Sequence, residues 1–214
     1  MFDSMEDRVR RLELYTEAQR LIGLYSSYMS LKEFDRIPAL FALGSENLRA
    51  EMLWGVYDGD AGIQRLYNGL FPALAAAEGP ASEELQGMEV PIIQVAKDCL
   101  TVKGVWVCPG YLTVTGADGK NRAYWSWQKC ACDFLVVGGE LKIWHLHIYG
   151  LFESLYGTTD VQSSGSVKYA GTIPDAFAPD RPPTTRFDLS TESIYPYAPA
   201  VPRAYTVFDQ DFAY

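Results

Sequence analysis

The first half of the chain carries apolar residues at helical spacing. Over residues 6–30 they recur every three or four positions with Arg and Glu between them, which predicts a long amphipathic helix. A second, short helix is predicted over 36–43, with Pro38 in its first turn and Gly44 after its end. Asp60 is a good N-cap for a third helix. The apolar positions of the first helix are Val9, Leu12, Tyr15, Ala18, Ile22, Tyr25 and Met29.

The pattern changes to that of strands from Met88 onward. Between the third helix and this point, residues 72–87 are rich in Ala, Glu and Gly, which indicates a short helix and a loop. Gly138-Gly139 is a two-residue hairpin signal, because both turn positions of a type I′ turn need a positive φ. Three helices followed by antiparallel strands predict an α+β fold in which the helices cover one face of a curved sheet. The predicted strands are 90–96, 100–107, 122–137 and 140–152, with an earlier extended stretch at 47–56.

Residues 153–214 differ in composition from the rest. Seven of the twelve prolines lie between Pro174 and Pro202, yet the segment is too rich in Tyr and Phe for an ordinary disordered tail. We therefore expect a domain at 1–152 and an extended arm at 153–214 that docks on the barrel or on a partner subunit, with a mobile tail as the alternative.

The hairpin turn predicts a register for the last two strands. If Val137 faces Glu140, then Cys132 opposes His145 and Cys130 opposes His147. Because side chains alternate between the two faces of a strand, one face then combines apolar groups with convergent polar ones, as a ligand pocket does. The other face is broad, aromatic and almost uncharged, which favours a homodimer contact. The first face carries Tyr124, Ser126, Gln128, Cys130, Cys132, Phe134, Ile143, His145, His147 and Tyr149; the second carries Trp125, Trp127, Ala131, Leu135, Trp144, Leu146, Ile148 and Phe152.

The two histidines are the chain's best candidates for proton transfer near neutral pH. Their neighbours Cys130 and Cys132 invite two other interpretations, a zinc site and a Cys–His nucleophile. Geometry disfavours zinc: the centre of a four-residue rectangle on two paired strands is ~4 Å from each Cβ, whereas a Zn-bound cysteine places its Cβ about 3.4 Å from the metal. Small core thiols are the simpler interpretation of the cysteines, and a hydrogen-bonded core histidine is the alternative for each His.

Charge and hydropathy narrow the classes of partner. The formal net charge is −9 and no run of Lys and Arg exists, which argues against nucleic acid. No apolar run approaches the ~20 residues of a membrane span, and the acidic N-terminus is unlike a signal peptide. We therefore expect a cytoplasmic protein whose four cysteines are thiols.

Several strings of the chain resemble the nuclear transport factor 2-like superfamily, in particular its bacterial SnoaL-like members. The order helix–helix–strand–helix–strands over residues 6–152 is similar to that family. So are the strings 39–42 (Ala-Leu-Phe-Ala), 54–59 (Trp-Gly-Val-Tyr-Asp-Gly) and 139–143 (Gly-Glu-Leu-Lys-Ile). The longer arm resembles extensions found in some of its members.

The resemblance implies a cone of curved antiparallel sheet packed against three N-terminal helices, dimeric through the outer face of the sheet. Ile143 would face the cone interior, which by alternation places both histidines on the pocket side. Family members include dehydratases, isomerases, cyclases and cofactorless lyases, alongside pure binding modules, so the fold does not settle the function. Some enzymes of the family have a tyrosine on the first helix followed five positions later by an acidic residue. Tyr25 fits the first position, but Ser30 occupies the second.

These observations predict a cofactor-independent lyase, dehydratase or isomerase that acts on a small, largely apolar molecule of aromatic, phenolic-dimer, polyketide-like or terpenoid-like character. The alternatives are a binding or sensing module with the same cavity, and a structural dimer whose cavity is filled. The chain is expected to need neither a metal nor a cofactor, to bind neither nucleic acid nor membrane, and to dimerise through Trp125, Trp127 and Trp144. Glu51 is a catalytic candidate if its strand turns it inward and an exposed glutamate if not. The predicted catalytic residues are His147, His145, Tyr25 and Glu51; the predicted substrate-binding residues are Trp54, Tyr28, Trp106, Tyr111, Tyr124, Gln128 and Tyr149.

Overall fold

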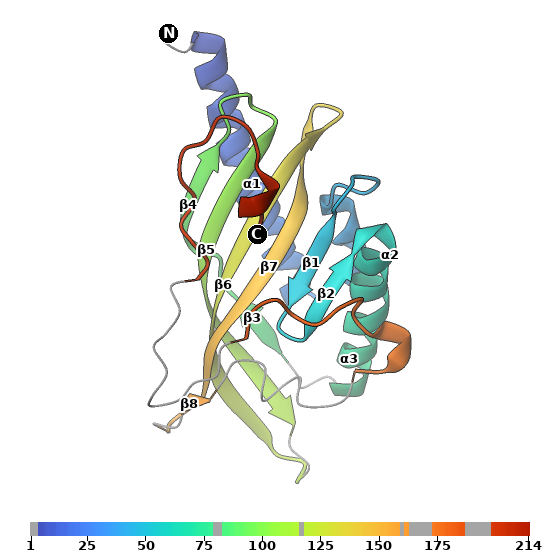
Figure 1. Cartoon of the computed structure of the whole chain (residues 1–214). Helices are drawn as coiled ribbons and strands as arrows, with labels where there is room; N and C mark the ends of the chain where they lie inside the picture. Colours follow the sequence, from blue (N-terminus) through green and yellow to red (C-terminus); the bar gives the residue numbers. More distant parts are fainter. Residues whose placement is uncertain (1–3, 79–82, 116–117, 159–160, 163–172, 187–197) are drawn as a thin grey trace.

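A computed structural model describes residues 4–78, 83–115, 118–158, 161–162, 173–186 and 198–214. Helix α1 (Met5–Ser30) begins at Ser4, whose side chain accepts a hydrogen bond from the Asp7 amide in a capping box. Its buried residues are Leu14, Ala18, Leu21, Ile22 and Tyr25. The helix is thus confirmed, but its predicted apolar face is wrong at the start: Val9 and Leu12 are 47% and 67% exposed. The first turns of α1 project beyond the end of the sheet (Figure 1), in agreement with the exposure of these two side chains.

The predicted helix at 36–43 is instead a pair of 3-10 turns, Phe34–Arg36 and Pro38–Leu40. The Phe41 backbone is extended and the Ala42 amide donates to the Ile143 carbonyl, so this segment leaves the helical conformation after Leu40. The predicted third helix begins two residues earlier than expected, with Asp58 rather than Asp60 as its N-cap. Helix α2 (Gly59–Gln64) runs through a π-helical turn (Arg65–Leu70) into α3 (Phe71–Glu78).

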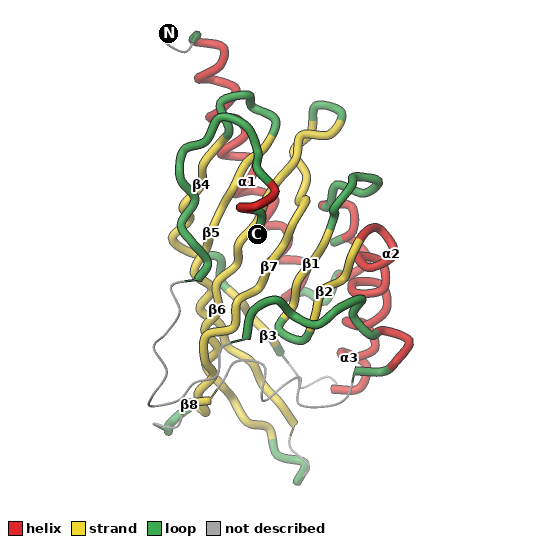
Figure 2. The backbone as a smooth tube through the Cα atoms, viewed as in Figure 1, coloured by secondary structure: helices red, strands yellow, loops and turns green. Residues whose placement is uncertain are grey.

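The sheet has the strand order β2-β1-β7-β6-β5-β3, with β4 paired to β5 and β8 to β7 (Figure 2). It is curved and unclosed and packs against the helices, so the predicted α+β fold is confirmed. One pairing differs from the purely antiparallel sheet expected from the sequence: β1 runs parallel to β7. The strands are β1 (Arg49–Met52), β2 (Gly55–Asp58), β3 (Glu84–Gln86), β4 (Glu89–Val95), β5 (Thr101–Thr115), β6 (Asn121–Val137), β7 (Glu140–Leu155) and β8 (Val161–Gln162).

The closing hairpin follows the predicted register only for its first four pairs. Gly138 and Gly139 have φ values of 59° and 91°, as the turn requires, and Phe134 faces Ile143. A β-bulge then interrupts the ladder, so His145 pairs with Asp133 and His147 with Ala131. The predicted pairing of the histidines with Cys132 and Cys130 is therefore wrong.

The bulge reverses which residues face the helices. Leu146 and Ile148 lie in or against the core together with Cys130 and Cys132. His145, His147 and Tyr149 lie on the opposite face of the sheet. We call the face toward α1 the inner face and the face away from it the outer face. Both histidines thus lie outside the cone, contrary to the inward orientation inferred from Ile143.

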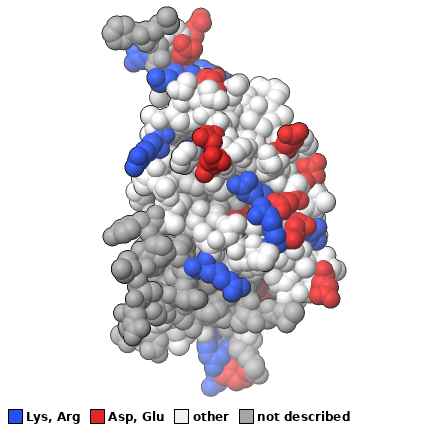
Figure 3. All heavy atoms as spheres, viewed as in Figure 1, with Lys and Arg blue, Asp and Glu red and all other residues white. Residues whose placement is uncertain are grey.

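The described parts of the arm, 173–186 and 198–214, cross the outer face (Figure 1). Val56 and the arm exchange main-chain hydrogen bonds: Val56 N–H donates to the Arg181 carbonyl (2.9 Å) and Asp180 N–H to the Val56 carbonyl (2.8 Å). Trp144, from the predicted dimer face, is only 9% exposed and packs against Phe208 at 4.8 Å between ring centroids. On this side of the molecule the basic and acidic side chains of the described residues are interspersed rather than segregated by sign (Figure 3).

Candidate functional site

A small cavity lies inside the cone, between α1 and the inner face of the sheet. Its volume is about 60 Å³. Apolar side chains make most of its wall, including the aromatic rings of Trp54 and Phe71. Three methionines contribute as well, and these flexible thioethers can adapt to a bound shape. The described lining residues are Tyr25, Ser26, Met29, Ser30, Met52, Leu53, Trp54, Phe71, Glu84, Gln86, Met88, Gln128 and Ile148.

Tyr25 lines the cavity and forms a pair with a second buried phenol, Tyr67, which is not among the described lining residues. The Tyr67 hydroxyl donates to the Tyr25 hydroxyl at 3.3 Å, and the two rings meet edge to face with centroids 6.1 Å apart. Burial raises the pKa of Tyr25 well above its usual value, and the nearby Glu84 carboxylate adds to the rise. Tyr25 therefore stays protonated near neutral pH. Since Tyr67 already donates to it, its own hydrogen is available to a molecule in the cavity.

Three thiols lie on the inner face. Cys130 Sγ is 3.6 Å from Cys132 Sγ, and Cys108 Sγ is 3.3 Å from Met88 Sδ. Burial raises the pKa of Cys108 and Cys132, so these groups are poor nucleophiles. Because the histidines face the other way, neither the Cys–His pair nor the four-residue zinc arrangement forms. No group of three or more His, Cys, Asp or Glu residues suited to a metal ion occurs in the part of the chain that the structure describes.

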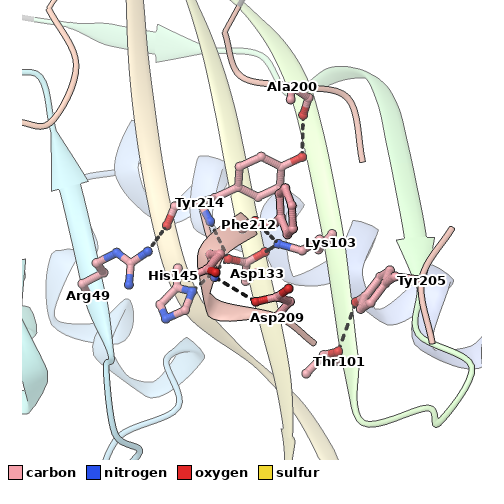
Figure 4. Close-up of polar contacts among 11 residues, drawn as sticks. Arg49, Thr101, Lys103, Asp133, His145, Ala200, Tyr205, Asp209, Phe212 and Tyr214 are labelled. Carbon is pink, nitrogen blue, oxygen red and sulfur yellow. Dashed lines mark hydrogen bonds and ion pairs between the residues drawn. The ribbon is translucent and has the colours of Figure 1, made fainter. Parts of the chain in front are cut away.

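On the outer face, Asp133 is the centre of a buried polar cluster (Figure 4). Its carboxylate accepts from Lys103 Nζ (2.6 Å), from His145 Nδ1 (2.8 Å) and from the Tyr214 amide (2.7 Å). Lys103 also donates to the Phe212 carbonyl at 2.7 Å, and Arg49 to the Tyr214 carbonyl at 2.5 Å. The cluster thus joins β1, β5, β6 and β7 to the end of the arm.

Burial lowers the pKa of His145, although its hydrogen bond to Asp133 opposes that effect. The imidazole is therefore neutral near pH 7. The ionised carboxylate can only accept, so the proton lies on Nδ1 and Nε2 is left as an acceptor. Within the described residues, Nε2 is buried and has no hydrogen-bond partner.

A second outer-face cluster joins His147 to the arm. Its Nε2 is 3.2 Å from Glu51 Oε1 and 3.0 Å from Thr185 Oγ1, and its ring stacks on Tyr149 at 3.7 Å. The Thr184 amide and hydroxyl both donate to Glu51 Oε1, at 2.6 and 2.8 Å. Burial alone would raise the pKa of Glu51, but His147 and Thr184 hold it below its usual value. Glu51 is therefore turned toward the arm and not into the cone.

The predicted site residues consequently separate into groups. Tyr25, Trp54 and Gln128 meet at the cavity, whereas His145, His147, Glu51 and Tyr149 lie on the outer face. The other four predicted binding residues are not among the described residues that line the cavity. Trp106 is buried against Phe134, and Tyr28 lies under the Arg36 guanidinium. Tyr111 and Tyr124 are paired across the sheet with Trp125 and Leu112.

Sequence reasoning missed Glu84 and Gln86 at the cavity, Tyr67 as the partner of Tyr25, and Lys103 and Asp133 on the outer face. Glu84 and Gln86 belong to β3, a three-residue strand whose pattern is too short to distinguish from a loop. Lys103 and Asp133 had a weak signal: each is a charge within a long apolar strand, where a buried charge requires a partner.

No protein-family model matches the chain, and no curated protein matches it in sequence. Among solved structures it is similar to a type 2 hexachlorocyclohexane dehydrochlorinase (LinA), with a TM-score of 0.55 and 14% identity over 72% of this chain and 94% of that one. A LinA type 3 from Novosphingobium barchaimii gives 0.54 and 13% over 72% and 95%. A protein assigned as a scytalone dehydratase of Novosphingobium aromaticivorans gives 0.53 and 12% over 72% and 95%. At these identities the similarity shows the fold, and it confirms the predicted nuclear transport factor 2-like resemblance at that level.

The same structures leave more than a quarter of this chain unmatched. Among the helices of the described residues, none combines the length and apolar composition that a bilayer-crossing segment needs.

Proposed function

On the premise of the nuclear transport factor 2-like fold, we propose that the chain is a cofactor-independent lyase or isomerase acting on a small, largely apolar molecule held in the cone. One observation carries the proposal: a phenol that stays protonated, Tyr25, and a carboxylate, Glu84, line the same apolar cavity. The similar structures named as a dehydrochlorinase and a dehydratase catalyse eliminations, as those names state, which agrees with this class of reaction.

The proposed division of roles follows from the chemistry of the two groups, a carboxyl group and a buried phenol. Glu84 accepts a proton from a carbon of the substrate, and the electron pair of that C–H bond moves toward the neighbouring carbon or carbonyl. Tyr25 donates a hydrogen bond to the oxygen that departs or gains negative charge. Tyr67, which donates to Tyr25, keeps that phenol oriented. A group that must remain neutral and one that accepts a proton are the pair that an elimination or an enolisation needs.

The histidines take a different role in this proposal than the sequence suggested. His147 contacts Glu51 and Thr185, and His145 is held by Asp133, all on the far side of the sheet from the cavity. We assign them to holding the arm on the outer face rather than to proton transfer.

A screen of small phenols, cyclic ketones and polyketide fragments by thermal shift, followed by product analysis by mass spectrometry, identifies a substrate. Glu84→Gln is then expected to lower kcat at least about 100-fold while leaving Kd within about threefold. Tyr25→Phe is expected to lower kcat similarly. His147→Gln is the control and should retain turnover. Full activity in Glu84→Gln would contradict the proposed role of this carboxylate.

The small volume of the cavity limits the size of any ligand, whether or not the ligand is turned over, and a binding module without catalysis is the second candidate. Ligand pockets usually measure about 300–1,000 Å³, and the cavity here is about 60 Å³. A substrate must therefore be compact or must displace the methionine side chains. A ligand that binds and is recovered chemically unchanged with every candidate tested would support this second function.

A further inference from the structure

We infer that the end of the cone cavity formed by β3, β5 and β6 is a subsite for the hydroxyl group of an uncharged, compact ligand, with Gln86 as the residue that selects it. The inference concerns the ligand class of the cavity already proposed as the functional site, and so it rests on that proposal. It does not depend on whether the ligand is turned over.

Two neighbours position Gln86: one holds its main chain, and the other leaves room for its side chain. Its carbonyl accepts from Ser26 Oγ of α1 at 2.6 Å. On the facing strand, Gly110 pairs with Gln86, and a Cβ built on Gly110 would lie 2.2 Å from Gln86 Oε1. The carboxamide therefore occupies space that exists only because residue 110 is glycine.

Two amides converge on one hydroxyl at this end. Gln86 Nε2 donates to Ser126 Oγ at 3.2 Å, and Gln128 Nε2 donates to the same atom at 3.5 Å. Both glutamines line the cavity. Ser126 is fully buried, so this polar group is part of the interior and not of the solvent-exposed rim.

The hydrogen bonding among Gln86, Gln128 and Ser126 leaves one acceptor unsatisfied. Gln86 Oε1 is buried and has no hydrogen-bond partner within the described residues. Buried acceptors are nearly always satisfied, because an unpaired one forfeits its hydration without replacement. The terminal torsion of glutamine is soft, so a small rotation of the carboxamide can turn this oxygen toward a donor in the cavity.

The remaining lining defines the rest of the ligand. No Lys, Arg or His occurs among its described residues, and Glu84 is the only charged one, which disfavours an anionic ligand. Trp54, Phe71 and the three methionine thioethers suit a flat ring, since sulfur–aromatic contacts are favourable. A cavity of about 60 Å³ allows one ring at most, and only when the methionines move. These features describe a neutral single-ring phenol or cyclic alcohol.

The test compares ligands that differ only in the donor. Binding of 4-methylphenol, 4-fluorotoluene and 4-methylbenzoate to the full chain is measured by titration calorimetry. One net hydrogen bond predicts that the phenol binds about 3- to 10-fold tighter than the fluoro compound, and the benzoate should bind more weakly than either. Gln86→Met should bring the phenol down to the affinity of the fluoro compound and leave the latter unchanged. Gln19→Met, on the exposed side of α1, is the matched control and should keep the preference.

Equal affinity for the phenol and the fluoro compound, absence of binding by both, or tighter binding of the benzoate would overturn the inference. So would a preference for the phenol that persists in Gln86→Met. Should that variant fail to fold, Gln86→Asn retains the amide but shortens its reach, and the same loss of preference is expected. The calorimetry measures binding alone, so loss of the phenol preference would refute the subsite without bearing on catalysis. The turnover assay with Glu84→Gln tests the catalysis without bearing on the phenol preference, so the two failures are distinguishable.

Discussion

Replacing Asp133 by Asn tests whether the outer-face cluster holds this fold together. Asp133 is fully buried, and Lys103, with 8% of its side chain exposed, forms an ion pair with it at 2.6 Å. The Asn oxygen can still accept from His145 and from the Tyr214 amide, which both contact Asp133 Oδ2. The Asn NH2 group then takes the place of Oδ1 and cannot accept from Lys103, so the variant loses both the negative charge and the acceptor of the ammonium group. What remains is a buried ammonium group without a counter-charge.

The expected loss of folding stability in Asp133→Asn is large for so small a change in the side chain. Breaking a buried ion pair by removing one partner costs about 3–5 kcal/mol, against a total stability of about 5–15 kcal/mol for an ordinary domain. For a chain of this size each kcal/mol corresponds to about 2–4 °C, which predicts a decrease in Tm of about 6–20 °C. The double variant Lys103→Met/Asp133→Asn removes both charges and should regain most of the loss.

Urea unfolding followed by circular dichroism measures the free energies of the wild type, the two single variants and the double variant, and the cycle isolates the coupling between the two residues. Fluorescence of Trp144, which packs on Phe208 of the arm, reports whether the arm detaches first. A loss below about 1 kcal/mol in Asp133→Asn, or additive single variants, would refute the reasoning, since a buried pair cannot be that weakly coupled.

Three further predictions concern the histidine, the arm and a close packing contact. Because the pKa of His145 is lowered in the folded chain, the unfolded chain binds more protons below about pH 6.5, and stability should fall as the pH drops through that value. His145→Asn should flatten this part of a Tm-against-pH curve. An unchanged slope would assign the pH dependence to other groups. Glu51→Gln removes the charged acceptor of the Thr184 amide. Hydrogen exchange at that amide should accelerate at least about tenfold, while core amides stay protected. An exchange rate at Thr184 equal to that of the wild type would show that this contact contributes little to holding the arm. Gly104→Ala places a methyl group about 2.2 Å from the Trp106 ring and should lower the free energy of unfolding, measured with urea, by about 1–3 kcal/mol. Gly23→Ala, on the open side of α1, should raise it by about 0.4–1 kcal/mol. A change of the same sign in both variants would contradict the packing argument.

The closing hairpin shows how far a pattern can be followed. Gly138-Gly139 identified the turn, and the register held through Phe134 and Ile143. One extra residue at the bulge then moved both histidines to the other face. A bulge depends on how neighbouring segments meet the strand: the Ala42 amide donates to the Ile143 carbonyl, and the Trp144 indole donates to the Glu46 carbonyl. None of these contacts is encoded in the alternation of the strand itself.

The candidate site divides in the same way. Tyr25 and Gln128 were found from the sequence because a helix face and a strand face repeat at fixed intervals. Trp54, in the turn between β1 and β2, was found as an aromatic candidate for the cavity wall. Glu84 and Gln86 were not, since β3 is three residues long and acquires its place only by pairing with β5.

The sequence by itself determined the α+β order of helices and strands and the hairpin turn, because periodicity and turn residues act over a few neighbouring positions. The tertiary structure decided which face each strand presents, that β1 joins β7 in parallel, and that the histidines hold the arm while Tyr25 and Glu84 share the cone. These outcomes depend on contacts between residues about a hundred positions apart, such as Glu51 with His147 and Lys103 with Phe212. A local pattern cannot specify which of the many compatible pairings buries its charges in partnership.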